Sequence, residues 1–341
     1  MPHPDIPETT FMRRRELGVE DYAQGILAGD RATLGRAITL IESTNPNHER
    51  HAEQLLVRLL PKSGSAMRIG ITGIPGAGKS TFIEALGRRL TQAGHRVAVL
   101  AVDPSSSTTG GSILGDKTRM VELAADPRAF IRPSPSSGTL GGVTRKTHET
   151  MVLCEAFGFD VVIIETVGVG QSETMVDDMV DFFLVLMVAG AGDELQGIKR
   201  GVLELADLIA VNKCDGDNVL RAELARREYA TALHFMRPKH ADWTATAKTC
   251  SAVTGAGLDD IWAAVESHRD KLTSTGRLQS RRQTQLVRWM WNMIDERLRS
   301  RFRQHPGVLA LQPGMERALL EGEVTAARAA TSLLEAFGLG D

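Results

Sequence analysis

The stretch Gly73-Ile-Pro-Gly-Ala-Gly-Lys-Ser80 decides the fold, because it matches the phosphate-loop pattern GxxxxGK[ST] at every position. It follows an apolar run at 67–73 and precedes a helical stretch that begins at Thr81, which is the context the pattern requires. Glycines let the backbone turn its N–H groups toward phosphate oxygens, and the helix directs its positive end at the anion. We therefore predict a nucleotide phosphate site in this loop.

Two side chains of the loop have specific predicted tasks. Lys79 supplies a positive charge near the terminal phosphates, and the Ser80 hydroxyl is placed to ligate Mg²⁺. The predicted nucleotide contacts of the loop are Gly73, Pro75, Gly76, Ala77, Gly78, Lys79, Ser80 and Thr81.

Short apolar runs alternate with helical stretches through the middle of the chain. They lie at 67–73, 96–103, 161–166, 182–189 and 208–213, and they are rich in β-branched residues. Such runs are typical of strands covered on both faces, and their alternation with helices predicts an α/β fold with a doubly wound, mostly parallel sheet. Ligands in this architecture lie at the carboxyl ends of the strands.

Helical patterns flank this region on both sides. Asp30 is a predicted N-cap for a helix with apolar residues at helical spacing, and a second helix is expected from about Glu49 to Leu60, ending at Pro61. After residue 274 a long helix and then a shorter helical pair, from about Gly314 to Phe337, are expected.

A second motif, Asn212-Lys213-Cys214-Asp215, matches NKxD directly after the run at 208–213. The Asp215 carboxylate can accept both the ring N–H and the exocyclic amine of guanine, whereas adenine would leave it unpaired. The Lys213 stem can lie over the base. Further on, Ser251, Ala252 and Val253 resemble a loop whose backbone amide contacts the guanine oxygen. Together with the phosphate loop, these motifs predict GTP rather than ATP as the ligand.

Acidic residues follow two of the predicted strands. Asp103 ends one run, Glu165 lies near the end of another, and Asp116 lies in a glycine-rich segment between them. Carboxylates at strand ends beside a phosphate loop are candidate ligands for Mg²⁺ or its water. Gly168 lies where its backbone N–H can meet the γ-phosphate. The next position holds Val169 rather than a water-orienting glutamine, so we predict slow intrinsic hydrolysis that a partner accelerates.

Composition excludes several classes of function. The net charge is −2 and no run is apolar and long enough to span a bilayer, which disfavours nucleic-acid and membrane partners. Three widely spaced cysteines indicate no disulfide framework, and the histidines show no metal-ligand spacing with them. The amino-terminal residues read as neither a secretory signal nor a transit peptide, so we expect a soluble cytoplasmic protein.

The predicted long C-terminal helix carries two signals. Its arginines are interpreted as a solvated face rather than a nucleic-acid patch, and they are Arg281, Arg282, Arg288, Arg297, Arg299, Arg301 and Arg303. Its apolar residues, including Trp289, Met290, Trp291 and Met293, are interpreted as a subunit interface.

Taken together, these motifs and the segments between them resemble the MeaB/ArgK family of GTPases. The resemblance runs from about residue 25 to the C-terminus, on GITGIPGAGKST, AVDPSSSTTGGSILGDKTRM, SPSSGTLGGV, VIIETVGVGQSE, AGAGDELQGIKRGVLELADLI and VNKCDG. It implies a SIMIBI-type P-loop GTPase domain at 62–273, an N-terminal helical extension at 1–61 and a C-terminal helical dimerisation arm at 274–341.

The resemblance also implies a purpose and further site residues. It implies a homodimeric chaperone that uses GTP and Mg²⁺ to gate cofactor loading and protection of an adenosylcobalamin-dependent acyl-CoA mutase, chiefly methylmalonyl-CoA mutase. Asp103, Asp116 and Glu165 match its acidic magnesium and switch positions, and the loop at 190–199 resembles its third switch, with Lys199 the candidate catalytic residue there. Nickel-inserting relatives carry Cys/His ligands near the nucleotide, and such clusters are absent from this sequence. Two alternatives stay open: a P-loop protein kinase or phosphotransferase, and a GTP-dependent scaffold with negligible turnover.

Overall fold

The computed structural model describes residues 17–102, 120–133, 140–166, 172–190, 200–236, 238–240 and 242–339. Within these ranges the strands are β1 (Met67–Gly73), β2 (Val97–Val102), β3 (Ala129–Arg132), β4 (Val161–Thr166), β5 (Phe182–Val188), β6 (Leu208–Asn212) and β7 (Thr246–Thr249). The helices before β5 are α1 (Val19–Leu27), α2 (Arg31–Glu42), α3 (Pro46–Leu59), α4 (Lys79–Gln92), α6 (Val121–Ala125), α7 (Leu140–Phe157) and α8 (Ser172–Asp177), with a 3₁₀ turn at Leu60–Lys62. Those after β5 are α10 (Arg200–Leu205), α11 (Val219–His234), α12 (Leu258–Ser274), α13 (Arg277–Gln304), α14 (Pro306–Leu320) and α15 (Ala326–Phe337), with a 3₁₀ turn at Gly216–Asn218.

Among the described residues, seven strands form one parallel sheet in the order β3-β2-β4-β1-β5-β6-β7. The doubly wound α/β prediction is confirmed, and the five predicted strands are present with ends that differ by at most one residue. The sequence interpretation missed β3 and named no run for β7, which are the two edge strands. Both are four residues long and include half-exposed or exposed side chains, so neither forms the continuous apolar run that identifies a central strand.

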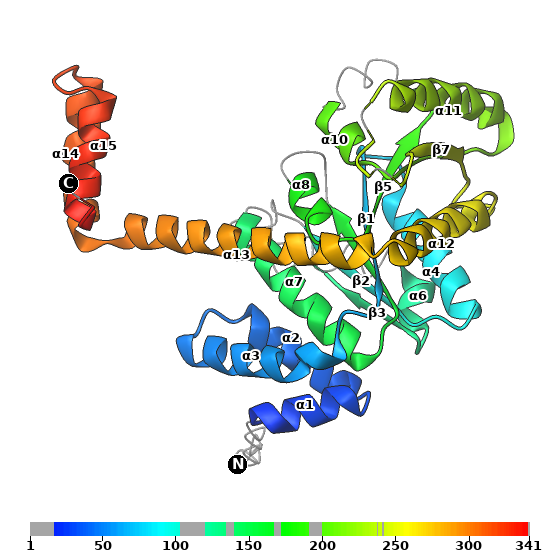
Figure 1. Ribbon diagram of the computed structural model, residues 1–341, viewed down its shortest axis with the longest axis horizontal. Coiled ribbons are helices and arrows are strands. Elements are labelled where there is room, and N and C mark those ends of the chain that lie inside the picture. The colour runs from blue at the N-terminus through cyan, green and yellow to red at the C-terminus, as the bar shows by residue number, and fades with distance from the viewer. Residues whose placement is uncertain are drawn as a thin grey trace, which may run out of the picture.

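Helices cover both faces of the sheet, and the N-terminal helices form an additional layer (Figure 1). α4 lies against β1 and β2 and contacts α6, whereas α7 and α8 contact each other, with α7 packed on β2 and β4 and α8 on β1 and β4. Helices α1, α2 and α3 pack on one another and on α7, with Ile26, Leu34, Ile38 and Leu55 fully buried among them. The predicted N-cap Asp30 is confirmed, since its carboxylate accepts from the N–H groups of Ala32 and Thr33.

The second of the two predicted N-terminal helices corresponds to α3, which begins earlier than expected. The side chain of Asn45 caps α3 by accepting from the N–H of Asn47 at 2.9 Å, and Pro46 occupies the first turn, where a missing N–H costs nothing. The expected start at Glu49 was therefore about one turn late. Pro61 lies in the 3₁₀ turn that follows α3.

The amino ends of three strands share one hydrogen-bonding arrangement. An aspartate directly before the strand exchanges two hydrogen bonds with the start of a neighbouring strand. Its N–H donates to the neighbour's carbonyl, and its carboxylate accepts from the neighbour's N–H. The pairs are Asp160 with Arg96, at 3.1 and 2.7 Å; Asp181 with Arg68, at 2.9 and 2.9 Å; and Asp207 with Phe183, at 2.8 and 2.9 Å. These aspartates satisfy N–H groups that the sheet ladder leaves unpaired where the strands begin.

The far end of α13 and the two helices after it lie apart from the sheet. Figure 1 shows α13 extending away from the body and carrying the α14–α15 hairpin at its far end. The helical pair begins at Pro306 rather than near Gly314, because α14 continues through Pro313 and Gly314. None of the helices in the described ranges has the length and apolar character needed to cross a membrane.

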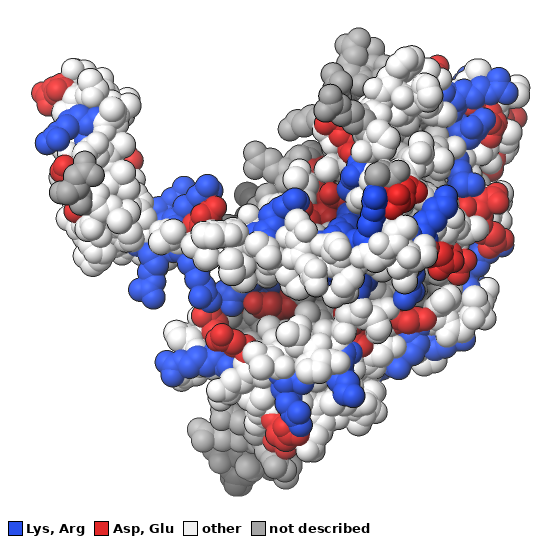
Figure 2. Space-filling model, viewed as in Figure 1, with Lys and Arg blue, Asp and Glu red and all other residues white. Residues whose placement is uncertain are grey.

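Two interpretations of the long helix need correction. Figure 2 shows Lys and Arg side chains gathered on the distal part of α13, and its arginines from 297 to 303 are exposed, as expected. Arg281 and Arg282 are different, because their side chains are only 11% and 12% exposed and pair with Asp177 and Asp181. In the apolar stripe, Trp289 stacks on His148 of α7 at 4.9 Å within the same chain, whereas Trp291 remains 57% exposed.

Candidate nucleotide site

The phosphate loop connects the central strand β1 to α4. Gly73 must lack a side chain, because a Cβ there would lie 2.2 Å from the carbonyl oxygen of Leu186 in the neighbouring strand β5. Gly78 adopts a left-handed conformation with φ 85°, and a Cβ there would lie 2.9 Å from Nδ2 of Asn212. The loop therefore packs directly against β5 and against the NKxD motif, which accounts for two of its glycines. Lys79, Ser80 and Thr81 form the first turn of α4.

The side chain of Lys79 folds back over the loop. Its Nζ donates to the carbonyl oxygens of Gly73 at 2.8 Å and Ile74 at 3.4 Å. Burial lowers the pKa of Lys79, and the nearby carboxylates of Glu165 and Glu173 oppose that shift. Lys79 is thus a partly buried ammonium held at the start of α4, which is the position at which a phosphate would be neutralised.

Ser80 and Glu165 bring two oxygen ligands together at the end of β4. The Ser80 hydroxyl donates to Oε1 of Glu165 at 3.3 Å, and Glu165 is only 4% exposed. At the same edge the Thr166 hydroxyl donates to the Thr72 hydroxyl at 2.7 Å, which ties the carboxyl end of β4 to that of β1. A hydroxyl and a carboxylate are the hard oxygen donors that Mg²⁺ prefers, so the residues present fit this ion.

Asn212 joins the phosphate loop to the guanine motif. Its Nδ2 donates to the carbonyl oxygen of Ala77 at 2.8 Å, and its Oδ1 accepts from the N–H of Ala252 at 3.0 Å. The Cys250 thiol also contacts Oδ1, at 3.7 Å. Because Asn212 is 2% exposed and both ends of its amide are used, it fixes the separation between the phosphate site and the base site.

The carboxylate proposed to recognise the base is held by a serine hydroxyl. The Ser251 hydroxyl donates to Oδ2 of Asp215, and the N–H of Thr254 donates to Ser251 Oγ at 3.1 Å. Lys213, between Asn212 and Asp215, adopts the left-handed region with φ 61°, and the Asn218 side chain donates to its carbonyl oxygen at 2.7 Å. A non-glycine residue in this region is strained, and such strain concentrates at functional sites.

The structure thus gathers the two predicted motifs at one edge of the sheet. The phosphate loop, Glu165, Asn212, Asp215, Ser251 and Ala252 all lie at or just after the carboxyl ends of β1, β4, β6 and β7. Val253 is 81% exposed beside them. Asp103, Asp116, Gly168 and Lys199 lie outside the described residues, as does Val169 of the argument about hydrolysis rate.

Sequence reasoning missed two contributors to this site. Glu173 is 1% exposed in the first turn of α8 and acts electrostatically on Lys79. The Cys250 thiol contacts the side-chain amide of Asn212, which also binds the N–H of Ala252. Neither residue belongs to a nucleotide-binding pattern, although an acid shortly after the Glu165 segment was a usable signal for Glu173.

Comparisons with known proteins agree on one kind of relative. A family model described as "Methylmalonyl Co-A mutase-associated GTPase MeaB" matches residues 34–307. The GTPase ArgK of Escherichia coli is 55% identical over 268 residues, which are 79% of this chain and 81% of that protein. The mitochondrial methylmalonic aciduria type A homolog of Mus musculus is 49% identical over 329 residues, which are 94% of this chain and 79% of that protein.

A solved structure supports the same fold. The crystal structure titled "LAO/AO transport system kinase" superposes with a TM-score of 0.77 at 40% identity, and the match covers 94% of this chain and 97% of that one.

Proposed function

The chain belongs to the MeaB family of methylmalonyl-CoA mutase-associated GTPases, and from this premise we propose that it binds GTP with Mg²⁺ and hydrolyses it slowly to GDP and phosphate. We further propose that its nucleotide state gates cofactor loading and protection of an adenosylcobalamin-dependent acyl-CoA mutase, such as methylmalonyl-CoA mutase. The printed names of the family and of the mouse relative support this partner.

One observation carries the assignment of guanine. Ser251 donates its only hydroxyl proton to Oδ2 of Asp215, so the carboxylate is oriented and keeps acceptor capacity for a base. A carboxylate that accepts from the ring N–H and the exocyclic amine selects guanine, because adenine offers no such pair of donors. Asn212 bonds to Ala77 of the phosphate loop and to Ala252 beside Ser251, so it holds the base-binding residues at a fixed distance from the phosphate loop.

Substitution of that carboxylate tests the assignment. Asp215→Asn exchanges an acceptor for a donor, so GTP binding should weaken by about 100-fold or more while xanthosine triphosphate binding improves. Competition of the two triphosphates against a fluorescent nucleotide measures the change. Asp217→Asn is the matched control, because Asp217 is exposed two residues further on and should leave the preference unchanged. An unaltered preference in Asp215→Asn would refute the guanine assignment.

The phosphate side of the site is built to stabilise negative charge. Lys79 and the N–H groups at the start of α4 are the groups that would bind the phosphates. When bound, Mg²⁺ supplies further neutralisation of the phosphate oxygens. Ser80 and Glu165 would hold it, and the family resemblance adds Asp103 and Asp116. Ordered donors of this kind stabilise the transferring phosphoryl group without reorganising during the reaction.

Hydrolysis itself is the next measurement. Single-turnover assays with and without a cobalamin-dependent mutase should show a slow rate alone and a faster rate in the complex. A fast unaided rate would contradict the argument from Val169. Transfer of labelled γ-phosphate to a protein instead of water would favour a phosphotransferase, and absence of phosphate release would favour a scaffold.

We also propose a division of labour along the chain. Residues 1–61 form an N-terminal helical extension, 62–273 the GTPase domain and 274–341 an arm that makes the homodimer. Large apolar side chains on α13 support the last assignment, since Val287 is 57%, Trp291 57% and Leu298 55% exposed. Sedimentation of Trp291→Asp together with Leu298→Asp should show a monomer where the unaltered chain is dimeric.

A further inference from the structure

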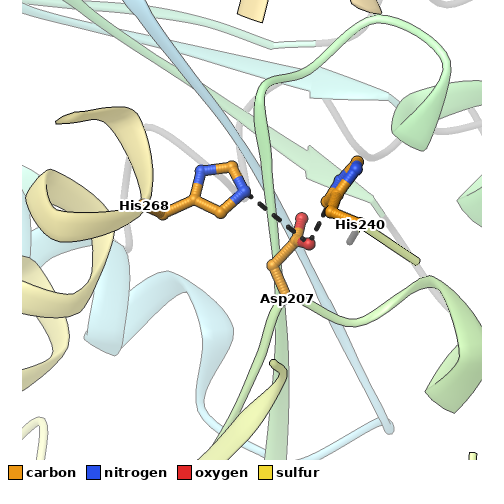
Figure 3. A group of neighbouring side chains, drawn as sticks. All are labelled: Asp207, His240 and His268. Atoms are coloured by element: carbon orange, nitrogen blue, oxygen red, sulfur yellow. Dashed lines mark ion pairs between the residues drawn. The ribbon is translucent and has the colours of Figure 1, made fainter. Parts of the chain in front are cut away.

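A cluster of buried charged and imidazole side chains lies at the amino edge of the sheet, opposite the nucleotide site. Figure 3 shows three of them: Asp207 directly before β6, His240 from the segment before β7, and His268 from α12. Lys239 Nζ contacts Asp207 Oδ2 at 3.3 Å, donates to the Leu205 carbonyl at 2.9 Å and pairs with Asp177. Arg281 of α13 also pairs with Asp177, at 3.1 Å. We name this group the amino-edge cluster: Asp177, Asp207, Lys239, His240, His268 and Arg281.

Part of this cluster has the composition of a metal site. Ligand atoms of Asp207, His240 and His268 lie within 4.8 Å of one another, although their sequence spacing indicates no such site. Two fixed cations disfavour a metal there. Lys239 already contacts the Asp207 carboxylate, and an Arg281 nitrogen contacts Nε2 of His240. A divalent ion would have to enter beside both positive charges in a buried setting, where repulsion is strong. The cluster is better explained as a junction between structural elements.

The element that leads from this junction toward the nucleotide is α8. Its first turn contains Glu173, which is buried and acts electrostatically on Lys79 of the phosphate loop. Its last residue is Asp177, which belongs to the amino-edge cluster. The two acids are four positions apart, so they lie on the same side of one short helix. α8 also packs against β1 and β4, the strands that end at the phosphate loop and at Glu165. This short helix therefore contacts the strands that carry the nucleotide site, and its last residue belongs to the junction.

The long helix α13 holds the segment that continues from α8. Gln285, 8% exposed, donates to the carbonyl oxygens of Asp177 at 3.1 Å and Val180 at 2.8 Å. Arg282 pairs with Asp181 at 2.6 Å, and Arg288 pairs with Asp178. The first turns of α13 thus contact the short connection between α8 and β5 through directional bonds. Such bonds specify one register and do not allow the two segments to slide freely past each other.

We propose that α8 couples the nucleotide site to the C-terminal arm, passing a shift at the phosphate loop to α13 through Arg281 and Gln285. This inference rests on the proposed GTP binding and names the route by which nucleotide state reaches the dimerisation arm. Coupling of this kind is reciprocal, so the position of the arm also changes nucleotide affinity by the same factor. A mutase or second subunit that engages the arm would thereby alter the nucleotide site without contacting it.

Hydrogen–deuterium exchange on the full chain tests the proposal. With Mg²⁺ present, a non-hydrolysable GTP analogue and GDP should give different exchange rates in α8 and in residues 277–290. We expect a difference of about fivefold or more, the lower end of common coupling strengths. In Gln285→Met and Arg281→Met the difference should persist in α8 and fall below about twofold in 277–290.

A matched variant separates coupling from simple anchoring of the helix. Arg277 lies on the same helix but pairs with Asp242, which is not part of α8, at 2.9 Å. Arg277→Met should therefore keep the response in both segments. Gln285→Met removes no charge, so it remains informative if Arg281→Met lowers stability, which thermal unfolding of each variant records.

The outcomes distinguish this inference from the proposed function. Guanine-nucleotide binding measured by calorimetry tests the function alone, and its absence would overturn both. If binding is intact, an unresponsive α8, an unresponsive α13 in the unaltered chain, or an undiminished response in Gln285→Met would each overturn the coupling only.

Discussion

The two edges of the parallel sheet use charged residues in opposite ways. At the carboxyl edge, Lys79 lies in the first turn of α4, Glu165 near the end of β4 and Asp215 after β6, where they line the candidate nucleotide site. At the amino edge, Asp181, Asp207 and Arg68 are buried, and each pairs with a group on another element, namely Arg282, Lys239 and Glu155. At the carboxyl edge the charges stay available for a ligand. At the amino edge they pair with other protein groups and stabilise the packing of helices and strands.

This contrast separates the expected effects of substitution. A charge facing a ligand is partly hydrated and contributes mainly to binding and rate. A buried charge with a protein partner leaves that partner uncompensated when it is removed, so its loss appears in the free energy of unfolding. Variants at the carboxyl edge should therefore change nucleotide binding and hydrolysis, and variants at the amino edge should change the free energy of unfolding. A variant that shows the opposite effect would contradict this comparison.

The largest expected effect is at Asp181. Its carboxylate accepts from Arg282 Nε at 2.8 Å and from the N–H of Arg68 at 2.9 Å, and it is fully buried. Asp181→Asn should lower the free energy of unfolding by roughly 3 to 5 kcal/mol, measured by denaturant titration, because it leaves Arg282 as an unbalanced buried cation. The control is Asp178→Asn, whose partner Arg288 is 57% exposed, and its cost should stay below about 1 kcal/mol. Equal costs would show that burial does not distinguish these pairs.

Lys79 should show the reverse pattern. Lys79→Met should reduce GTP hydrolysis by about 100-fold to 1,000-fold, because it removes the ammonium beside the transferring phosphate. Its free energy of unfolding should change by less than about 1 kcal/mol, since the bonds of Lys79 are to the loop backbone at the edge of the core. A severe loss of stability with unaltered hydrolysis would assign Lys79 to structure instead.

The amino edge should also make stability depend on pH. Burial lowers the pKa of His268 to about 4, and the repulsion from Arg281 adds to this against the opposing Asp207 carboxylate. The unfolded imidazole binds a proton below its ordinary pKa of 6.5, whereas the folded one does not until about pH 4. Stability is therefore fully present above pH 6.5 and falls as the pH decreases toward 4.

A variant measures how much of this pH dependence of stability comes from His268. Between pH 7.5 and pH 5, His268 should account for a loss of about 2 kcal/mol in the free energy of unfolding. His268→Leu should lack that share, and it should be tolerated at pH 7.5, because neither ring nitrogen has a hydrogen-bond partner among the described residues. The other groups facing this site are Asp207, Arg281, Asp181, Lys239 and His240, whose pKa burial also lowers to about 4, so the difference between the two proteins is the quantity to compare. The same pH dependence in both would exclude His268 as its source.

The smallest effect is expected on the distal arm. Arg301 is exposed on α13, so Arg301→Met should change the free energy of unfolding by less than about 0.5 kcal/mol. Arg282, on the same helix but paired with Asp181, is the contrasting position. A large cost at Arg301 would reveal a partner beyond a single chain.

The sequence was more informative about the carboxyl edge than about the amino edge. Phosphate loops and NKxD turns can be recognised in a single sequence, because the groups that make each contact come from a few neighbouring residues. The pairing of Asp181 with Arg282 joins residues far apart in the sequence, and no local pattern predicts it. A weaker signal was present, since an aspartate directly precedes each of the runs at 161–166, 182–188 and 208–212.

The sequence by itself determined the parallel α/β fold and the phosphate-loop motif, and it named Asp215 and Ser251 as candidate residues of a base site. Periodic apolar runs and contiguous motifs encode these features locally. Only the tertiary structure decided that Asn212 joins the phosphate loop to the loop at Ala252, that Glu173 acts electrostatically on Lys79, and that Arg281 and Gln285 of α13 reach the end of α8. These contacts depend on how helices and strands pack across the sheet, and that packing follows from the sum of many distant interactions.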